Sequence, residues 1–272
     1  MEFVDTHCHI HEAMYLHALN TETRRRYEKA GQPSPEDMLL AAMAADVRRV
    51  VCIGTTLEDS EVAVKFAGAH DTAWASIGIH PHEAKDYAGN EHALKRFAAL
   101  ASKKKVVGVG ECGLDYYYTH SLKADQETVL RFQIELALEH KLPMVFHVRD
   151  AFDDFWSIFD SYTGIRGIIH SFTATKKELD QIVERGLYVG LNGIMTFTNR
   201  QQQIDAAKAV PLEKMVLETD APFLTPEPYR GNICEPKHIR VTAEFLAELR
   251  GESIEDIARH TTENAESVFG LR

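Results

Sequence analysis

The chain begins with the stretch Phe3-Val4-Asp5-Thr6-His7-Cys8-His9, in which an apolar lead runs into two histidines placed two residues apart. On an extended backbone, residues i and i+2 point to the same side, so both imidazoles can reach one metal ion. The spacing suits a helix poorly, because residues two apart on a helix do not face each other. A metal site at the end of a strand, without a cysteine cage, indicates a catalytic metal in an α/β barrel.

The composition is typical of one large globular domain. The 272 residues are 44% hydrophobic and 26% charged, which is enough for a single core of barrel size and excludes a disordered chain. The net charge of -11 argues against a broad basic surface for nucleic acid, but not against a strand end that enters a metal-containing pocket. We expect a single domain over residues 1–272, with a lid or helical insertion at residues 12–35.

Cysteine content and hydropathy indicate the compartment. The four cysteines, at positions 8, 52, 112 and 234, include no C-x-x-C pair and are typical of reduced thiols. No signal peptide is expected ahead of the metal-binding stretch, and no apolar run approaches the roughly 20 residues that span a bilayer. We therefore expect a cytoplasmic protein that binds no membrane and has no obligate protein partner.

Short apolar runs alternate along the chain with longer amphipathic segments that repeat apolar residues at spacings of three and four. Eight strands that are apolar on both faces, alternating with helices, predict a parallel sheet closed into a (β/α)8 TIM barrel. A doubly wound open sheet is the alternative, and the lack of G-x-G-x-x-G after the first run weakens its dinucleotide-binding form. The runs are Phe3–Asp5, Arg49–Gly54, Ala73–Ile79, Val106–Gly110, Met144–His147, Gly167–His170, Tyr188–Leu191 and Met215–Glu218.

Histidines and carboxylates follow these runs, which in a barrel places them around one mouth. Burying them together without a counter-ion would cost on the order of several kcal/mol, so a cation is their natural partner. Nitrogen and oxygen ligands without thiolate suit Zn²⁺, Mn²⁺, Fe²⁺ or, less well, Mg²⁺. Six ligands suit two ions about 3.5–4 Å apart that share a carboxylate and activate a water. The six are His7, His9, Glu111, His147, His170 and Asp220.

Seven motifs spread over nearly the whole chain resemble the TatD family of metal-dependent hydrolases, within the amidohydrolase superfamily. The resemblance implies a TIM barrel and a divalent-metal-dependent hydrolase. Family members are best known as deoxyribonucleases, often 3′-to-5′ exonucleases, so DNA, as single strands or 3′ ends, is the implied substrate. The motifs are Asp5–His9, Gly78–His82, Gly110–Tyr116, Pro143–Ala151, His170–Phe172, Glu218–Pro222 and Arg230–Pro236.

The resemblance also implies roles for single residues. Two divalent ions, zinc, magnesium or manganese, would be bound per chain, with Glu111 bridging them and Asp220 acting as general base toward the attacking water. His80, His82 and Arg230 would lie on the substrate side. One ion would be held by His7, His9, Glu111 and Asp220, and the second by Glu111, His147 and His170.

Other features leave alternatives open. The three consecutive tyrosines Tyr116, Tyr117 and Tyr118 either stack on a base or pack their loop. The basic run Arg24–Arg26 either contacts a phosphate backbone or forms a solvated helix face. Cys234 and Ser171 stand where the family usually has asparagine and cysteine, which bears on the substrate.

Two other functions compete with the nuclease. One is a hydrolase of the same superfamily that acts on a small ester, lactone, amide or phosphoester. Glu111 and His147 occupy the positions where such an enzyme would carry a carboxylated lysine, which counts against it. The other is a metal-binding scaffold without catalysis, and a complete ligand set with a candidate base argues against that function.

Overall fold

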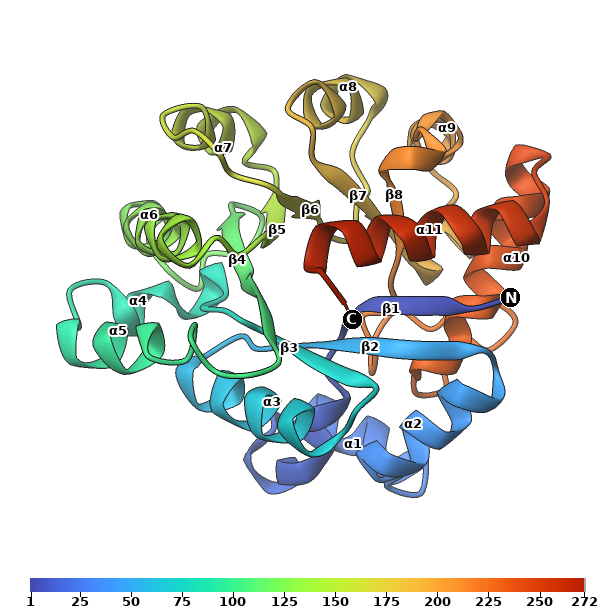
Figure 1. The fold of residues 1–272 in the computed structure, drawn as a ribbon, viewed down its shortest axis with the longest axis horizontal. Helices are drawn as coiled ribbons and strands as arrows, with labels where there is room; N and C mark the ends of the chain where they lie inside the picture. Colours follow the sequence, from blue (N-terminus) through green and yellow to red (C-terminus); the bar gives the residue numbers. More distant parts are fainter. Residues whose placement is uncertain (272) are drawn as a thin grey trace. The chain divides into compact units, whose positions relative to one another are not determined.

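The computed structural model describes residues 1–271, and within this range eight strands alternate with helices (Figure 1). The strands form a sheet in the order β1 to β8, so each strand neighbours the next one along the chain. The pairings of β1 with β2, β3 with β4, β4 with β5, β5 with β6 and β7 with β8 are parallel. The predicted (β/α)8 barrel fold is confirmed, and the open doubly wound alternative is not needed.

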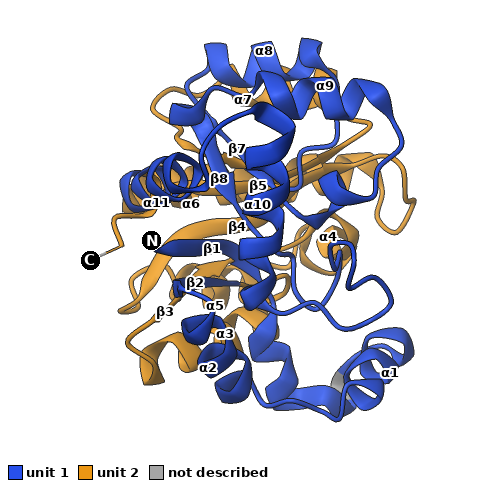
Figure 2. Ribbon diagram, turned by 90° about the vertical axis from the view of Figure 1, so that its right-hand side faces the viewer, with its two compact units in different colours: residues 1–52, 171–267, 272 blue, residues 53–170, 268–271 orange. Residues whose placement is uncertain are grey.

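Backbone contacts divide the chain into two compact units (Figure 2). Unit 1 comprises residues 1–52 and 171–267, and unit 2 comprises residues 53–170 and 268–271. Helix α11 begins in unit 1 and its last residues belong to unit 2.

In unit 1, β1 has neighbours on both sides, as a barrel strand requires. It pairs with β2 in the register Asp5↔Val50 and Cys8↔Cys52. On its other side, the Asp220 N–H donates to the His7 carbonyl at 2.8 Å, beyond the end of β8. All six residues of β1 are buried, which explains its continuous apolar lead. The elements are β1 (Phe3–Cys8), β2 (Val47–Ile53), β7 (Tyr188–Leu191), β8 (Met215–Leu217), α1 (Thr21–Lys29), α2 (Pro35–Ala44), α8 (Lys176–Glu184), α9 (Gln201–Ala209), α10 (Ile239–Arg250), α11 (Ile254–Phe269) and the 3-10 helices Ile10–Ala18, Gly193–Thr196, Leu212–Lys214 and Pro236–His238.

In unit 2, β4 is longer than the sequence predicts. The predicted strand stops at Gly110, whereas β4 runs to Asp115 and stays paired with β5 through Gly113↔His147. A Cβ on Gly113 would lie 1.9 Å from the His147 carbonyl oxygen, so glycine permits this close approach. The elements are β3 (Ala73–Ile77), β4 (Val106–Asp115), β5 (Met144–Arg149), β6 (Gly167–Ile169), α3 (Leu57–Ala69), α4 (Ala84–Tyr87), α5 (Glu91–Ala98), α6 (Lys123–His140), α7 (Phe152–Phe159) and the 3-10 helix Pro81–Glu83.

Residues 12–35 contain helical structure. Helix α1 is capped by Asn20, whose side chain accepts the Thr23 N–H at 2.9 Å, and the fully buried Tyr27 anchors it. Ser34 caps α2, and Asp37 completes the reciprocal pair of hydrogen bonds. None of the helices in residues 1–271 has the length and apolarity needed to cross a bilayer.

Candidate metal centre

Three predicted ligands converge in unit 1, where they form what we call the β1/β8 cluster: His7, His9 and Asp220. The Nε2 atoms of His7 and His9 lie 3.2 Å apart. Asp220 Oδ1 lies 3.6 Å from the first and 3.3 Å from the second. His7 and His9 are almost fully buried, whereas the Asp220 side chain retains 17% exposure. The cluster therefore presents two nitrogens and one oxygen to a single point that a small molecule can still reach.

A buried carboxylate that the sequence analysis did not single out holds this cluster in place. Asp5 accepts hydrogen bonds from the His7 N–H at 3.2 Å, the Thr219 N–H at 3.0 Å and the Thr219 hydroxyl at 2.6 Å. Burial raises the pKa of Asp5 well above its ordinary range, although hydrogen bonds from Thr219 and His7 favour the charged form. Asp5 thereby ties the strand that carries the histidines to the segment that carries Asp220.

Glu218 holds the segments that carry Ser171 and Asn192 in place through hydrogen bonds. Its Oε1 accepts the Ser171 N–H at 2.7 Å and the Asn192 amide at 3.1 Å, and Glu218 is completely buried. The same Asn192 amide also donates to the Ser171 hydroxyl at 2.9 Å. Ser171, one of the departures from the family pattern, thus belongs to a hydrogen-bonded support for the loop after β6.

Unit 2 holds the second group of predicted ligands, Glu111, His147 and His170, together with His80, and we call these four residues the Glu111 cluster. All three histidines have a ring nitrogen near Glu111 Oε1. The distances are 2.8 Å from His147 Nδ1, 3.4 Å from His170 Nε2 and 3.5 Å from His80 Nε2. The ligand atoms of His80, Glu111 and His147 lie within 4.8 Å of one another, which is close enough for one metal ion. His80, expected on the substrate side, therefore lies among the candidate ligands.

Asp115 is the functional residue that the sequence analysis missed. Its Oδ2 lies 3.0 Å from both His147 Nε2 and His82 Nε2, and its Oδ1 accepts the backbone N–H groups of Tyr117 and Tyr118. A carboxylate on the far nitrogen of a metal-binding histidine orients the ring and raises its basicity. The sequence spacing could have indicated this residue, because Glu111 and Asp115 are four residues apart and such residues point to the same side of an extended strand.

The charges in the Glu111 cluster shift the acidity of its groups. Burial alone would raise the pKa of Asp115, but hydrogen bonds from His147, His82 and the Tyr118 N–H outweigh it and hold the pKa well below its usual range. Burial would lower the pKa of His147, but its contacts with Asp115 and Glu111 raise it. For His80, burial dominates and lowers the pKa to about 4, so its imidazole is neutral at pH 7 and able to bind a cation.

The chemistry of the donor atoms matches a divalent ion. Both clusters contain only imidazole nitrogens and carboxylate oxygens. The neighbouring thiols of Cys8 and Cys112 are directed toward the backbone carbonyls of Val51 and Val145, at 3.6 and 3.7 Å. Such donor sets suit zinc, manganese or iron.

The remaining predicted site residues have other contacts. His82 is held by Asp115, and its ring lies 5.4 Å from that of Tyr118. The Arg230 guanidinium lies 3.9 Å from the Phe197 ring centroid and donates to the Thr225 carbonyl at 3.0 Å. Their substrate roles stay predictions.

A protein-family model described as TatD related DNase matches residues 4–270. The chain belongs to the TatD family. It is 33% identical over 273 residues to the Escherichia coli (strain K12) protein named "Uncharacterized metal-dependent hydrolase YcfH", covering 100% of this chain and 97% of that one. It is 33% identical over 246 residues to "3'-5' ssDNA/RNA exonuclease TatD" of Citrobacter koseri, covering 87% of this chain and 93% of the relative.

A solved TatD homologue has the same fold. The structure of YJJV from Escherichia coli K12 superposes with a TM-score of 0.84 at 24% identity, covering 99% of this chain and 98% of that one. The TatD match runs through both units without a break. The chain is therefore a metal-dependent hydrolase of the TatD family, and the predicted family and enzyme class are confirmed.

Proposed function

We propose that this TatD-family hydrolase is a 3′-to-5′ exonuclease that cleaves phosphodiester bonds of single-stranded nucleic acid, with DNA as the expected substrate. The observation that carries the proposal is the presence of two sets of nitrogen and oxygen ligand atoms at the carboxyl ends of barrel strands. The name of the Citrobacter koseri relative, which specifies single-stranded DNA and RNA, supports the substrate class.

We propose that the six predicted ligands hold two ions, as the resemblance to the TatD family implies. In a (β/α)8 barrel, functional residues lie at the carboxyl ends of the strands, which is where the sequence pattern places these ligands. Glu111 would be shared by the two ions. One ion would be held by His7, His9, Asp220 and Glu111, and the other by His147, His170 and Glu111, with His80 within reach as a further ligand.

The chain's own residues supply orientation and proton transfer. Bound divalent ions would lower the pKa of a water and stabilise the charge that develops on the phosphoryl oxygens. Asp220 would accept the proton of the attacking water, since its carboxylate is partly exposed beside His7 and His9. Asp115 would keep the His147 ring in its binding orientation through Nε2.

An aromatic surface beside the Glu111 cluster suits unpaired bases. Tyr117 and Tyr118 are 57% and 43% exposed, and their backbone N–H groups bind Asp115. The Arg149 guanidinium lies 3.9 Å from the Tyr117 ring centroid, and the Tyr118 ring stacks on His120 at 5.6 Å. Exposed rings with a cation beside them stack on bases of any sequence, as single-strand binding requires. We therefore assign these tyrosines to substrate binding.

The compartment belongs to the same proposal. All four cysteines are buried free thiols, which supports a reducing environment such as the cytoplasm.

The experiment is a nuclease assay on metal-free protein reloaded with Mg²⁺, Mn²⁺ or Zn²⁺. With a single-stranded oligodeoxynucleotide labelled at its 5′ end, we expect a ladder of products shortened from the 3′ end. Asp220→Asn should abolish the activity, and Asp153→Asn, which removes an exposed carboxylate from α7, should leave it unchanged. Full activity in Asp220→Asn, or no cleavage by the wild type with any of the three ions, would refute the proposed function.

A further inference from the structure

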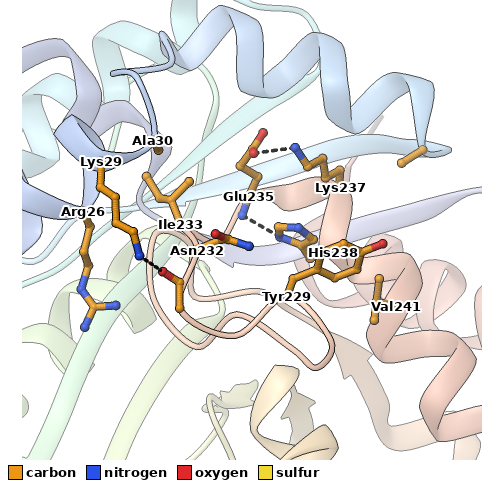
Figure 3. Close-up of a pocket in the computed structure, with 12 residues that line it drawn as sticks. Arg26, Lys29, Ala30, Tyr229, Asn232, Ile233, Glu235, Lys237, His238 and Val241 are labelled. Carbon is orange, nitrogen blue, oxygen red and sulfur yellow. Dashed lines mark hydrogen bonds and ion pairs between the residues drawn. The ribbon is translucent and has the colours of Figure 1, made fainter.

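Apart from the proposed metal ligands, unit 1 contains a pocket between helix α1 and the segment from Tyr229 to His238 that follows β8. Its volume is about 480 Å³, within the range of small-molecule sites. Arg26 and Lys29 lie on one side and Tyr229 with His238 on the other (Figure 3). The pocket is therefore built from residues 12–35 and a loop of the barrel, and none of its walls belongs to the proposed metal ligands.

The side of the pocket formed by α1 is cationic in a protein of net charge -11. Arg26 and Lys29 are three residues apart, so they share one face of the helix. Lys29 Nζ donates to the Gly231 carbonyl at 3.0 Å, a contact that leaves its charge uncompensated. Arg26 pairs with Glu22 at 2.7 Å, but both side chains are exposed and such a pair is weak. Among residues 1–271, the buried Nε of Arg26 finds no hydrogen-bond acceptor.

The opposite side combines aromatic and apolar groups with the ion pair of Lys237 and Glu235. Tyr229 is 45% exposed, and its ring lies 5.3 Å from that of His238 with an interplanar angle of 33°. His238 Nδ1 accepts the Glu235 N–H at 3.0 Å, so a neutral His238 carries its proton on Nε2. Ile233 and Val241 complete an apolar wall. A flat ring and a few polar groups in an apolar hollow form a suitable site for a nucleobase.

One side chain connects this pocket with the β1/β8 cluster. The Phe223 ring centroid lies 6.5 Å from that of His9 and 5.8 Å from the Arg26 guanidinium carbon. The Phe223 N–H donates to the Asp220 carbonyl at 2.8 Å. The Phe223 ring thus links the cationic side of the pocket with the proposed site of cleavage.

We propose that this pocket binds one nucleotide of the substrate strand, beyond the two nucleotides that are joined by the cleaved bond. Its phosphate lies at Arg26 and Lys29, and its base lies against Tyr229. This inference rests on the proposed function, which it extends by adding a subsite outside the metal centre. A free nucleoside monophosphate has the same chemistry, so the test separates it from a strand.

The test begins with binding to metal-free protein in EDTA, where no cleavage occurs. Fluorescein-labelled decathymidylate should bind more tightly than labelled dithymidylate. Tyr229→Ala and Arg26→Ala should each weaken decamer binding about tenfold, the effect of losing one stacked base or one charged contact, and leave the dimer unchanged. Tyr229→Phe should retain decamer affinity. Arg25→Ala, on the exposed face of the same helix, is the matched control and should behave as wild type.

The second arm measures kinetics with Mn²⁺. Tyr229→Ala should raise KM for the decamer about tenfold and leave kcat, as well as all constants for the dimer, unchanged. Equal effects on both lengths, no effect of Tyr229→Ala, or thymidine monophosphate binding as tightly as the decamer would overturn the inference. Absence of cleavage by the wild type would refute the nuclease proposal, whereas the binding arm would still decide whether the pocket holds a strand. Circular dichroism melts confirm that each variant is folded.

Discussion

At the scale of single residues, carboxylates orient the histidines of the proposed metal centre. His147 faces Glu111 with Nδ1 at 2.8 Å and Asp115 with Nε2 at 3.0 Å. One carboxylate is thus positioned to share a cation with His147, and the other to fix the ring. Removing the Asp115 carboxylate should therefore weaken metal binding without removing a metal ligand.

Asp115→Asn should lower the affinity for Mn²⁺ by about 10- to 100-fold, because the amide binds the His147 ring more weakly and can present its NH₂ group to it. Isothermal titration calorimetry measures this affinity. Asp153→Asn serves as the control for a carboxylate on the surface. An affinity equal to that of the wild type in Asp115→Asn would show that this carboxylate does not support the metal site.

His238 predicts a pH dependence of stability. Burial, assisted by the charge of Lys237, lowers its pKa from 6.5 to about 4. Between these values the unfolded chain binds more protons than the folded one, so stability is complete above pH 6.5 and is lost as the pH falls toward 4. The loss amounts to up to about 3 kcal/mol.

Urea unfolding at pH 7.5 and pH 5 measures this dependence. His238→Gln should reduce the difference in unfolding free energy between the two pH values, and His92→Gln, which changes an exposed histidine of α5, should not. An unchanged difference in His238→Gln would contradict the assignment.

Much of the site was predictable at this scale. His7 and His9 could be paired from their spacing, because a strand turns every second side chain to the same face. Asp115 and Asp5 were not singled out, because their role depends on contacts across the chain: Asp5 binds Thr219, 214 positions away. The placement of His80 beside Glu111 likewise depends on the packing of β3 against β4, which spacing does not give.

At the scale of elements, strand β4 positions the Glu111 cluster. Glu111 and Asp115 both lie within it, and its continuation past Gly110 requires close approach to β5. The sequence predicted that strand to end early because Gly110 and Gly113 interrupt the apolar run. In the structure these glycines have φ values of 139° and 146° and allow the strand to continue.

Gly113→Ala should destabilise the protein by more than about 4 kcal/mol, since the added Cβ would lie 1.9 Å from the His147 carbonyl oxygen. Gly186→Ala is the matched control, because Gly186 has a φ of 75° with nothing within 4 Å of the added Cβ. It should cost only about 1–2 kcal/mol. Urea unfolding gives both values, and similar costs for the two variants would contradict the steric argument.

At the scale of the whole molecule, the alternation of runs and helices was sufficient to predict the fold. All eight strands occur where the pattern placed them, with ends shifted by a few residues, and helices alternate with them as the pattern predicts. For residues 12–35 the sequence left a lid and a helical insertion open, because a polar segment such as Thr21–Lys29 is anchored by only two buried residues, Thr23 and Tyr27. Such an anchor leaves little periodicity in the sequence.

Metal binding should stabilise the entire fold. Mn²⁺ at 100 times its dissociation constant should add about 2.7 kcal/mol, which raises Tm by roughly 5–10 °C for a chain of this length. Differential scanning calorimetry with and without EDTA measures the shift. Glu111→Gln, which replaces the proposed bridging ligand, should remove most of it, and the same shift in that variant would contradict the assigned ligand set.

The central proposal is that the six predicted ligands hold two ions per chain, with Glu111 shared between them. The measurement that tests it most directly is anomalous diffraction from crystals grown with Mn²⁺. We predict two anomalous peaks about 3.5–4 Å apart, with Glu111 between them, His7, His9 and Asp220 at one, and His147 and His170 at the other. Two distant peaks, or peaks bound by residues outside the predicted ligand set, would contradict the proposal.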